Sequence, residues 1–79
     1  MQITLKLIAT YRKLLPPEAD GNTIELDLPA ETTIADVLAQ FDVPQDASSV
    51  VLLNGTVSPP ETILQNGDKV AVFSATAGG

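Results

Sequence analysis

A single helical pattern lies between two pairs of strand-like segments, and this order restricts the fold more than any other feature of the chain. The apolar residues of the helix have the spacing of one helix face: Ile34, Val37, Leu38 and Phe41. Thr33 is the expected N-cap, and Asp36 three residues later completes a capping-box pattern. We expect about three turns, ending at Pro44, a helix short enough to need a sheet to lie on.

The rest of the apolar residues follow strand patterns. Polar and apolar residues alternate over residues 2–7 and 23–28, which predicts two strands, and Ile8 and Ala9 extend the first. Residues 68–74 predict the last strand, with Val70 and Val72 on one face and Ala71 and Phe73 on the other. The continuous apolar run in "SSVVLLNGTV" predicts a further strand that is buried on both faces or nearly so. Its Asn54-Gly55 pair predicts a tight turn, after which Thr56-Val57 pairs back briefly.

Apolar residues outside these patterns are expected to complete the core. Tyr11, Leu14 and Leu15 should fold back over one edge of the core, and Ile63 and Leu64 should plug it from a short turn.

One helix between two strand pairs excludes a two-helix ferredoxin-like arrangement. A right-handed crossing by the helix lets the first and last strands pair in parallel at the centre of one sheet. The sequence therefore predicts an α+β fold of the β-grasp type, the architecture of ubiquitin, with a mixed sheet of four to five strands and one main helix packed on one face. We expect one β-grasp domain over residues 1–74 and a flexible C-terminal Gly-Gly tail over residues 75–79.

The composition removes most catalytic chemistry. The 79 residues include no cysteine and no histidine, so the chain has no thiolate nucleophile, no thiolate metal site and no histidine base. Asp42 with Asp46, and Glu18 with Asp20, lie in polar turn-like stretches and are interpreted as solvated surface charges. We therefore expect no bound cofactor, no metal and no enzymatic activity of the chain alone.

The charge restricts the partners. The net charge of −6 argues against nucleic acid and anionic lipid, which would repel the protein. No apolar run approaches the ~18 residues of a membrane span, and the N-terminus does not resemble a signal peptide, so we expect a cytoplasmic protein. The acidity suits a partner with a basic groove, and it also suits simple solubility.

The last residues, "FSATAGG", are the remaining candidate for chemistry. Five extended residues after Ser74 would reach roughly 17 Å. Glycine lets a backbone enter a narrow channel and approach a phosphate without a Cβ clash. A terminal carboxylate, with a pKa of about 3.3–3.7, is an anion at neutral pH and must be activated by another protein, typically as an acyl-adenylate.

Three motifs in this order, "LNGTV", "ILQNGDKVAVF" and the final Gly-Gly, resemble the ubiquitin-like sulfur carrier family. The resemblance implies that an adenylating enzyme of the ubiquitin-activating type uses ATP to convert the Gly79 carboxylate to an acyl-adenylate. It also implies that sulfur from a cysteine desulfurase or a rhodanese-like sulfurtransferase then replaces AMP, which leaves a thiocarboxylate on Gly79. Thr76, Ala77 and Gly78 would fit the tail into a partner's active site.

The family has two well-known branches. In one, the small subunit of molybdopterin synthase inserts its tail into the large catalytic subunit; in the other, a thiamin sulfur carrier serves thiazole synthase. The long loop over residues 10–22 favours the molybdopterin branch. Residues 74–77 depart from it, because members of that branch often have prolines at this place.

Phe73 has two interpretations. If the helix covers the side of Val70 and Val72, Phe73 and Leu53 contribute to an open apolar face where partners dock; otherwise Phe73 belongs to the core. Lys69 and Arg12 would be solvated charges or rim ion pairs with a partner.

Two other functions use the same sequence features. A protein modifier would transfer the Gly79 adenylate to a lysine of a target protein. A β-grasp interaction module would carry the two glycines with no role for them.

Overall fold

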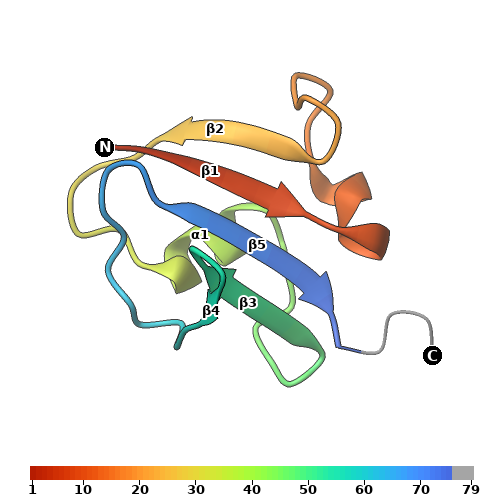
Figure 1. Cartoon of the computed structure of the whole chain (residues 1–79). Helices are drawn as coiled ribbons and strands as arrows, with labels where there is room; N and C mark the ends of the chain where they lie inside the picture. Colours follow the sequence, from red (N-terminus) through yellow and green to blue (C-terminus); the bar gives the residue numbers. More distant parts are fainter. Residues whose placement is uncertain (76–79) are drawn as a thin grey trace.

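The structure, a computed structural model that describes residues 1–75, is a five-stranded mixed sheet with one α-helix packed on one face (Figure 1). The elements are, in chain order, β1 Gln2–Leu7, η1 (a 3₁₀ helix) Ala9–Leu14, β2 Thr23–Asp27, α1 Ile34–Gln40, β3 Ser49–Leu53, β4 Thr56–Val57 and β5 Lys69–Ser74. The strand order is β2-β1-β5-β3-β4, with β1 and β5 parallel and every other pair antiparallel. The predicted β-grasp fold, with the first and last strands paired at the centre, is confirmed.

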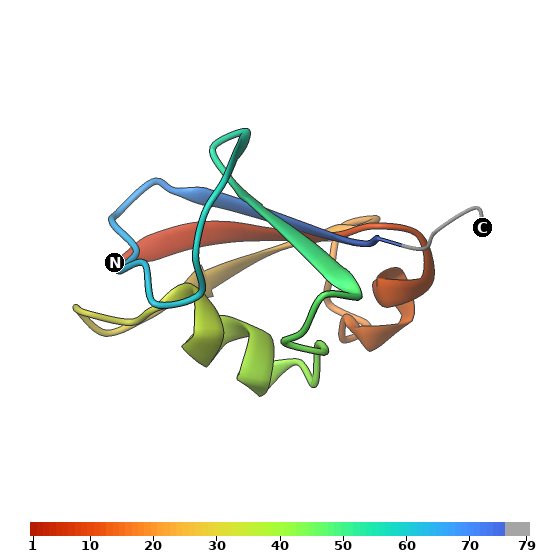
Figure 2. The ribbon, with the colours of Figure 1, turned by 90° about the horizontal axis from the view of Figure 1, so that it is seen from below.

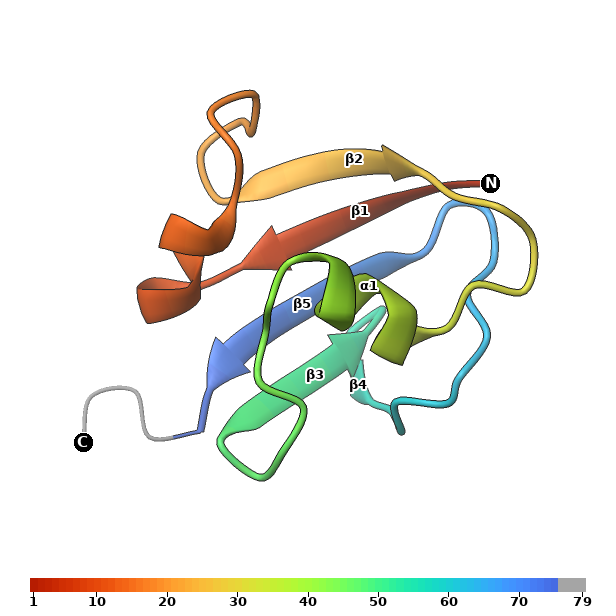
Figure 3. The same cartoon turned by 180° about the vertical axis from the view of Figure 1, so that it is seen from behind.

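The core lies between the sheet and α1, which Figure 2 shows below the sheet in an edge-on view. Because side chains alternate along a strand, one face of the two central strands supplies the core and the other does not. The residues with less than 2% exposure include three from β1, two from β5, three from α1 and one from a loop: Ile3, Leu5, Leu7, Val70, Val72, Ile34, Val37, Leu38 and Leu64. In Figure 3 the helix crosses over β5 and β3.

The start of α1 agrees with the prediction, and its end does not. The Thr33 hydroxyl accepts a hydrogen bond from the Asp36 amide (3.2 Å), and the Asp36 carboxylate accepts one from the Thr33 amide (3.0 Å), so the capping box is present. The helix has seven residues and ends at Gln40, before Pro44. Asp42 has a φ of 59°, a left-handed conformation that stops the helix without the proline.

The segment after β1 is helical, and its first residues do not extend the strand. The prediction that Ile8 and Ala9 continue the strand is wrong, because Ala9 has a φ of 57° and begins η1. This short 3₁₀ helix buries Tyr11 and packs Leu14 and Leu15 partly against the core. Their predicted position over an edge of the core is thus confirmed.

Two burial predictions are wrong. All five residues of β3 are half-buried, because the face of β3 that α1 does not cover lies open and the two-residue strand β4 covers only the end of its outer side. Ile63 is 55% exposed and pairs through an isolated bridge with Thr33, while its neighbour Leu64 fills the core as expected.

The motifs "LNGTV" and "QNGD" meet where β5 begins. Asn54 and Gly55 both have positive φ angles, 51° and 88°, as a tight hairpin turn requires. The Asp68 carboxylate accepts hydrogen bonds from the Gln65 amide (2.8 Å) and the Asn54 side-chain amide (3.0 Å). The Asn54 side-chain oxygen accepts from the Lys69 amide at 2.9 Å. These two motifs therefore connect β3 to the start of β5. The C-terminal end of β5 lies at the opposite end of the sheet.

None of the helices within residues 1–75 has the length and apolar character of a membrane span.

Candidate functional site

The end of β5 is anchored by its neighbours on both sides. The Ala75 amide donates to the Ser48 carbonyl at 2.7 Å, and the Ile8 amide donates to the Val72 carbonyl at 3.0 Å. Val72 is fully buried. We call Ser48, Ser74 and Ala75 the tail root, since residues 76–79 follow directly.

Tyr11 connects η1 to the tail root. Its ring is 9% exposed, and its hydroxyl lies 2.7 Å from the Ser49 hydroxyl and donates to the Ser48 carbonyl at 3.4 Å. The Ser48 carbonyl thus accepts from Tyr11 and from Ala75. A side chain 64 residues away in sequence from Ala75 therefore takes part in fixing where the chain leaves the sheet.

Asp46 holds the loop that carries Ser48. Its carboxylate accepts hydrogen bonds from the Ser48 hydroxyl and from the Ser48 amide (2.8 Å), and these bonds lower the pKa of Asp46. The carboxylate is exposed and remains an anion at neutral pH. It is a turn-stabilising group beside the tail root.

The sheet face opposite α1 is divided into a polar half and an apolar half. In antiparallel strands, directly opposite residues lie on the same face, so the register of β3 with β5 and β4 places five apolar side chains together. They are Phe73, Val50, Ala71, Leu52 and Val57, which we call the open apolar face. Val57 is 70% exposed. The polar half consists of alternate residues of β1 and β2, such as Thr4 and Glu25.

Phe73 lies on the open apolar face and Leu53 does not. Val70 and Val72 are covered by α1, so the half-buried Phe73 points to the opposite side of the sheet. Leu53 is opposite Val70 and packs against the core, which contradicts its predicted docking role. Leu52 takes that place. The run "VVLL" gives no sign of which residue faces which side, and only its pairing with β5 decides it.

Two lysines border the open apolar face. Lys6 is opposite Ala71, and Lys69 lies two residues before Ala71 on the same side of β5. The ion pair that the structure gives within residues 1–75 joins the N-terminal amine to Asp27 (3.7 Å) and involves neither lysine. Arg12 belongs to η1, outside this face.

The other predicted site residues, Thr76, Ala77, Gly78 and Gly79, lie outside the described residues. Within residues 1–75, no three His, Cys, Asp or Glu side chains come close enough to hold a metal ion. Sequence reasoning missed Tyr11 as a partner of Ser48 and missed Val50, Leu52 and Val57 as neighbours of Phe73. Val50, Leu52 and Val57 are placed by strand pairing, and Tyr11 is placed by the packing of η1 against the start of β3, so no local pattern predicts them.

The family match covers nearly the whole chain. The model of the ThiS family matches residues 5–79. A search of curated proteins gave no significant match.

Solved structures with similar folds include three archaeal proteins. SAMP1 from Haloferax volcanii has a TM-score of 0.78 at 22% identity, with all of both chains covered. A putative molybdopterin converting factor, subunit 1, from Pyrococcus furiosus has a TM-score of 0.73 at 22% identity, covering 92% of this chain and 95% of its own. A ubiquitin-like protein from Caldiarchaeum subterraneum has a TM-score of 0.56 at 18% identity, covering 96% and 97%. The chain belongs to the ThiS family and has the ubiquitin-like β-grasp fold of its sulfur carriers.

Proposed function

We propose that the protein is a sulfur carrier that acts through the carboxylate of Gly79. The observation that carries this proposal is the family match, which extends through Gly78 and Gly79. The chain has neither cysteine nor histidine, so it offers no thiolate nucleophile and no histidine base of its own.

In the proposed reaction a partner enzyme of the ubiquitin-activating type joins the Gly79 carboxylate to AMP from ATP, releasing pyrophosphate. A persulfide carried by a sulfurtransferase or cysteine desulfurase would displace AMP, which leaves an acyl disulfide on Gly79. A second thiol of the donor system would then cleave the S–S bond and be oxidised to a disulfide, so that Gly79 ends in a thiocarboxylate. Gly78 and Gly79 have no Cβ, so the backbone can approach the nucleotide phosphates closely. Ala77 and Thr76 would follow Gly78 and Gly79 into the channel of the partner's active site. The proposed reaction requires no cofactor bound to this chain. We propose that the protein acts in the cytoplasm.

The open apolar face is the proposed docking surface for these partners. A contiguous apolar patch rimmed by polar groups is typical of a protein-binding site. It lies next to the end of β5, since Phe73 precedes the tail root directly. Lys6 and Lys69 would pair with acidic groups around an apolar partner surface.

The proposed acceptor of the sulfur is the large subunit of molybdopterin synthase. The fold similarity to the Pyrococcus furiosus subunit and the long connection between β1 and β2 support this branch. In the thiamin alternative, thiazole synthase would take the sulfur instead. The stretch Ser74–Ala77, which has no proline, is the feature that fits the molybdopterin branch least well.

A second candidate function is conjugation to other proteins. It is favoured by the fold similarity to SAMP1 and to a structure described as small archaeal modifier protein 1, which has a TM-score of 0.72 at 21% identity over 91% of this chain and 94% of its own. The same Gly79 adenylate would then form an isopeptide bond with a lysine of the target.

Intact-mass measurement of the protein from its own host separates these functions. A species with one oxygen replaced by sulfur supports the carrier, and a series of larger conjugates supports the modifier. If neither species forms even when the activating enzyme and ATP are supplied, both proposals fail and the interaction module remains.

A further inference from the structure

Two asparagines of the chain stand directly before a glycine, in the pairs Asn54-Gly55 and Asn66-Gly67. An asparagine in this position can react with its own backbone, because the amide nitrogen of the next residue can attack the side-chain carbon Cγ. Glycine has no Cβ to obstruct that approach. All four residues are exposed, so water reaches both pairs. The hydrogen bonds around the two pairs differ, and this difference predicts that they react at different rates.

The pair Asn66-Gly67 is held by one residue of β1. The Gly67 amide donates to the Gln2 carbonyl at 2.7 Å, and the Asn66 side-chain oxygen accepts from the Gln2 amide at 2.7 Å. The attacking nitrogen and the group that it would attack are therefore both bound to Gln2. Both hydrogen bonds must break before Asn66 can react, and the folded protein loses the stabilisation that each provides.

The pair Asn54-Gly55 is held differently. Among residues 1–75 the Gly55 amide has no hydrogen-bond partner, so the attacking nitrogen is not restrained. The Asn54 side chain is bound only through the amide that would be attacked. Its oxygen accepts from the Lys69 amide (2.9 Å), and its nitrogen donates to the Asp68 carboxylate (3.0 Å).

These two contacts of Asn54 suit the charges that develop during the attack. The Lys69 amide stabilises the negative charge that the side-chain oxygen gains as Cγ becomes tetrahedral. The Asp68 carboxylate stabilises the positive charge that the side-chain nitrogen gains when it is protonated to leave. The surroundings of Asn54 therefore favour the reaction that the surroundings of Asn66 oppose.

We propose that Asn54 is a self-modification site, at which the folded protein releases ammonia and takes up water. The Gly55 nitrogen forms a bond to Cγ of Asn54 and gives its proton to the solvent. The bond between Cγ and Nδ2 then breaks, and Nδ2 leaves as ammonia with a proton taken from water, which leaves a cyclic imide. Water opens the imide at either of its carbonyl groups and produces aspartate or isoaspartate at position 54. The reaction is independent of the chemistry proposed at Gly79.

Either product weakens the connection between β3 and β5. Aspartate places a carboxylate where the Asn54 amide donates to Asp68, so a hydrogen bond is replaced by repulsion between like charges. Isoaspartate adds a carbon atom to the backbone of a turn whose two residues have the positive φ angles of a tight hairpin. The modified chain should therefore be less stable than the original one.

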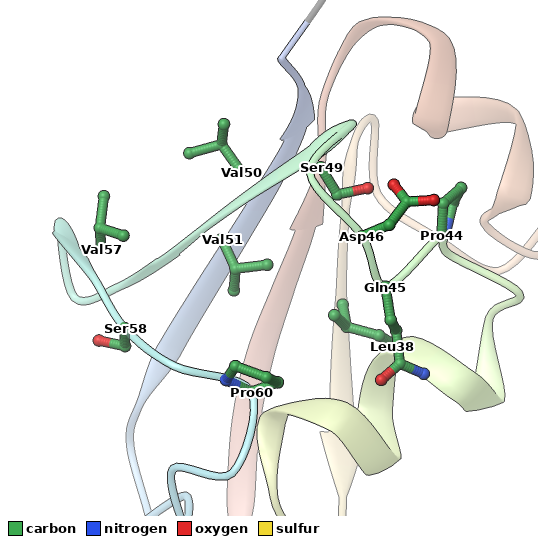
Figure 4. Close-up of a pocket in the computed structure, with 10 residues that line it drawn as sticks. All are labelled: Leu38, Pro44, Gln45, Asp46, Ser49, Val50, Val51, Val57, Ser58 and Pro60. Carbon is green, nitrogen blue, oxygen red and sulfur yellow. The ribbon is translucent and has the colours of Figure 1, made fainter.

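The hairpin that this turn closes has few other contacts. β4 pairs with β3 only through Val57 and Thr56, and both of these residues are exposed. Val57 and Ser58 line one side of a groove of about 340 Å³, and Leu38 lies on the other side (Figure 4). Modification of Asn54 therefore loosens one wall of this groove.

The test is incubation of the folded wild-type chain at mildly alkaline pH, followed by cleavage after Glu61 to separate the two pairs for mass measurement. The exchange of NH for oxygen should appear in the Asn54 peptide about tenfold faster than in the Asn66 peptide. The product at position 54 should contain isoaspartate as well as aspartate, because direct hydrolysis of the side chain gives aspartate alone. In urea, where the hydrogen bonds are absent, the two peptides should react at similar rates.

A matched pair of variants tests the effect on stability. Asn54→Asp has the charge of one product and should unfold at a lower urea concentration than the wild type. Asn66→Asp makes the same charge change but keeps the oxygen that accepts from the Gln2 amide, so it should unfold close to the wild-type concentration.

Several results would overturn the proposal. In the folded chain these are no reaction at Asn54, a reaction at Asn66 that is as fast or faster, or a product at position 54 without isoaspartate. Equal stability of Asn54→Asp and the wild type would overturn it as well.

Discussion

The two sides of β5 show how differently one strand can be used. Val70 and Val72 are fully buried under α1, whereas Ala71 and Phe73, the residues beside them in sequence, are half-buried on the open sheet face. The same strand leads into the tail root. The covered side therefore stabilises the domain, and the open side is free for recognition.

This division suits a protein whose proposed reactive group, the Gly79 carboxylate, follows the last strand in sequence. Partners can bind the open apolar face without disturbing the core. Substitutions on the two faces should accordingly affect different measurements, and the predictions below compare them.

The largest expected effect on stability comes from the covered face. Leu5→Ala removes a fully buried side chain and should lower the free energy of unfolding by about 2–5 kcal/mol. Leu52→Ala makes the same change on the open apolar face, where the side chain is half-buried, and should cost about 1 kcal/mol. Urea unfolding of both variants measures the difference. Equal losses would contradict the division into two faces.

The open face should dominate partner binding. Phe73→Ala removes the aromatic side chain next to the tail root and should weaken binding to the activating enzyme about tenfold. Thr4→Ala lies on the polar half of the same face and should change the affinity by less than about twofold. Calorimetric titration gives both affinities, and melting curves show whether each variant is folded. If the two variants bind alike, the open apolar face is not the docking surface.

A smaller effect is expected at the tail root. Tyr11→Phe removes the hydroxyl that bonds to Ser49 and Ser48 and should lower the free energy of unfolding by about 1 kcal/mol. In a double-mutant cycle with Ser49→Ala, the losses should be less than additive, because both variants break one hydrogen bond. Full additivity would show that this hydrogen bond contributes nothing.

The smallest effect is a pH dependence at Asp46. Hydrogen bonds from Ser48 lower the pKa of Asp46 in the folded state, so the folded protein binds the proton less readily than the unfolded chain. The stabilisation is therefore present above the pKa of the unfolded chain and is lost as the pH falls through the lower folded value. Wild type should exceed Asp46→Asn in stability by a constant amount above about pH 5, and the difference should shrink below about pH 4. A difference that grows on acidification would contradict the direction of the shift.

Features that depend on neighbouring residues in sequence were predictable. Three such features are present: the capping box of Thr33 and Asp36, the Asn54-Gly55 turn, and the alternation of β1 and β2. The 3₁₀ helix over residues 9–14 was missed because so short an element has no periodic apolar pattern of its own.

The facing of individual residues within a paired strand, and contacts between segments far apart in sequence, were not predictable. The chain contains four consecutive apolar residues at 50–53, and a pattern without alternation does not say which of them faces the helix. Leu53 was misplaced for this reason, and Leu52 and Val57 were missed. The contact of Tyr11 with Ser48 and Ser49 joins segments 37 or 38 residues apart, so no local sequence pattern predicts it.

The most direct test of the account is the intact mass of the protein after incubation with an adenylating enzyme, ATP and a sulfur donor. The wild-type chain should exchange one oxygen for sulfur. A chain lacking Gly79 should keep its mass and should unfold at the same urea concentration as the wild type. If the shortened chain gained sulfur, Gly79 would not be the carrier residue and the central claim would be wrong.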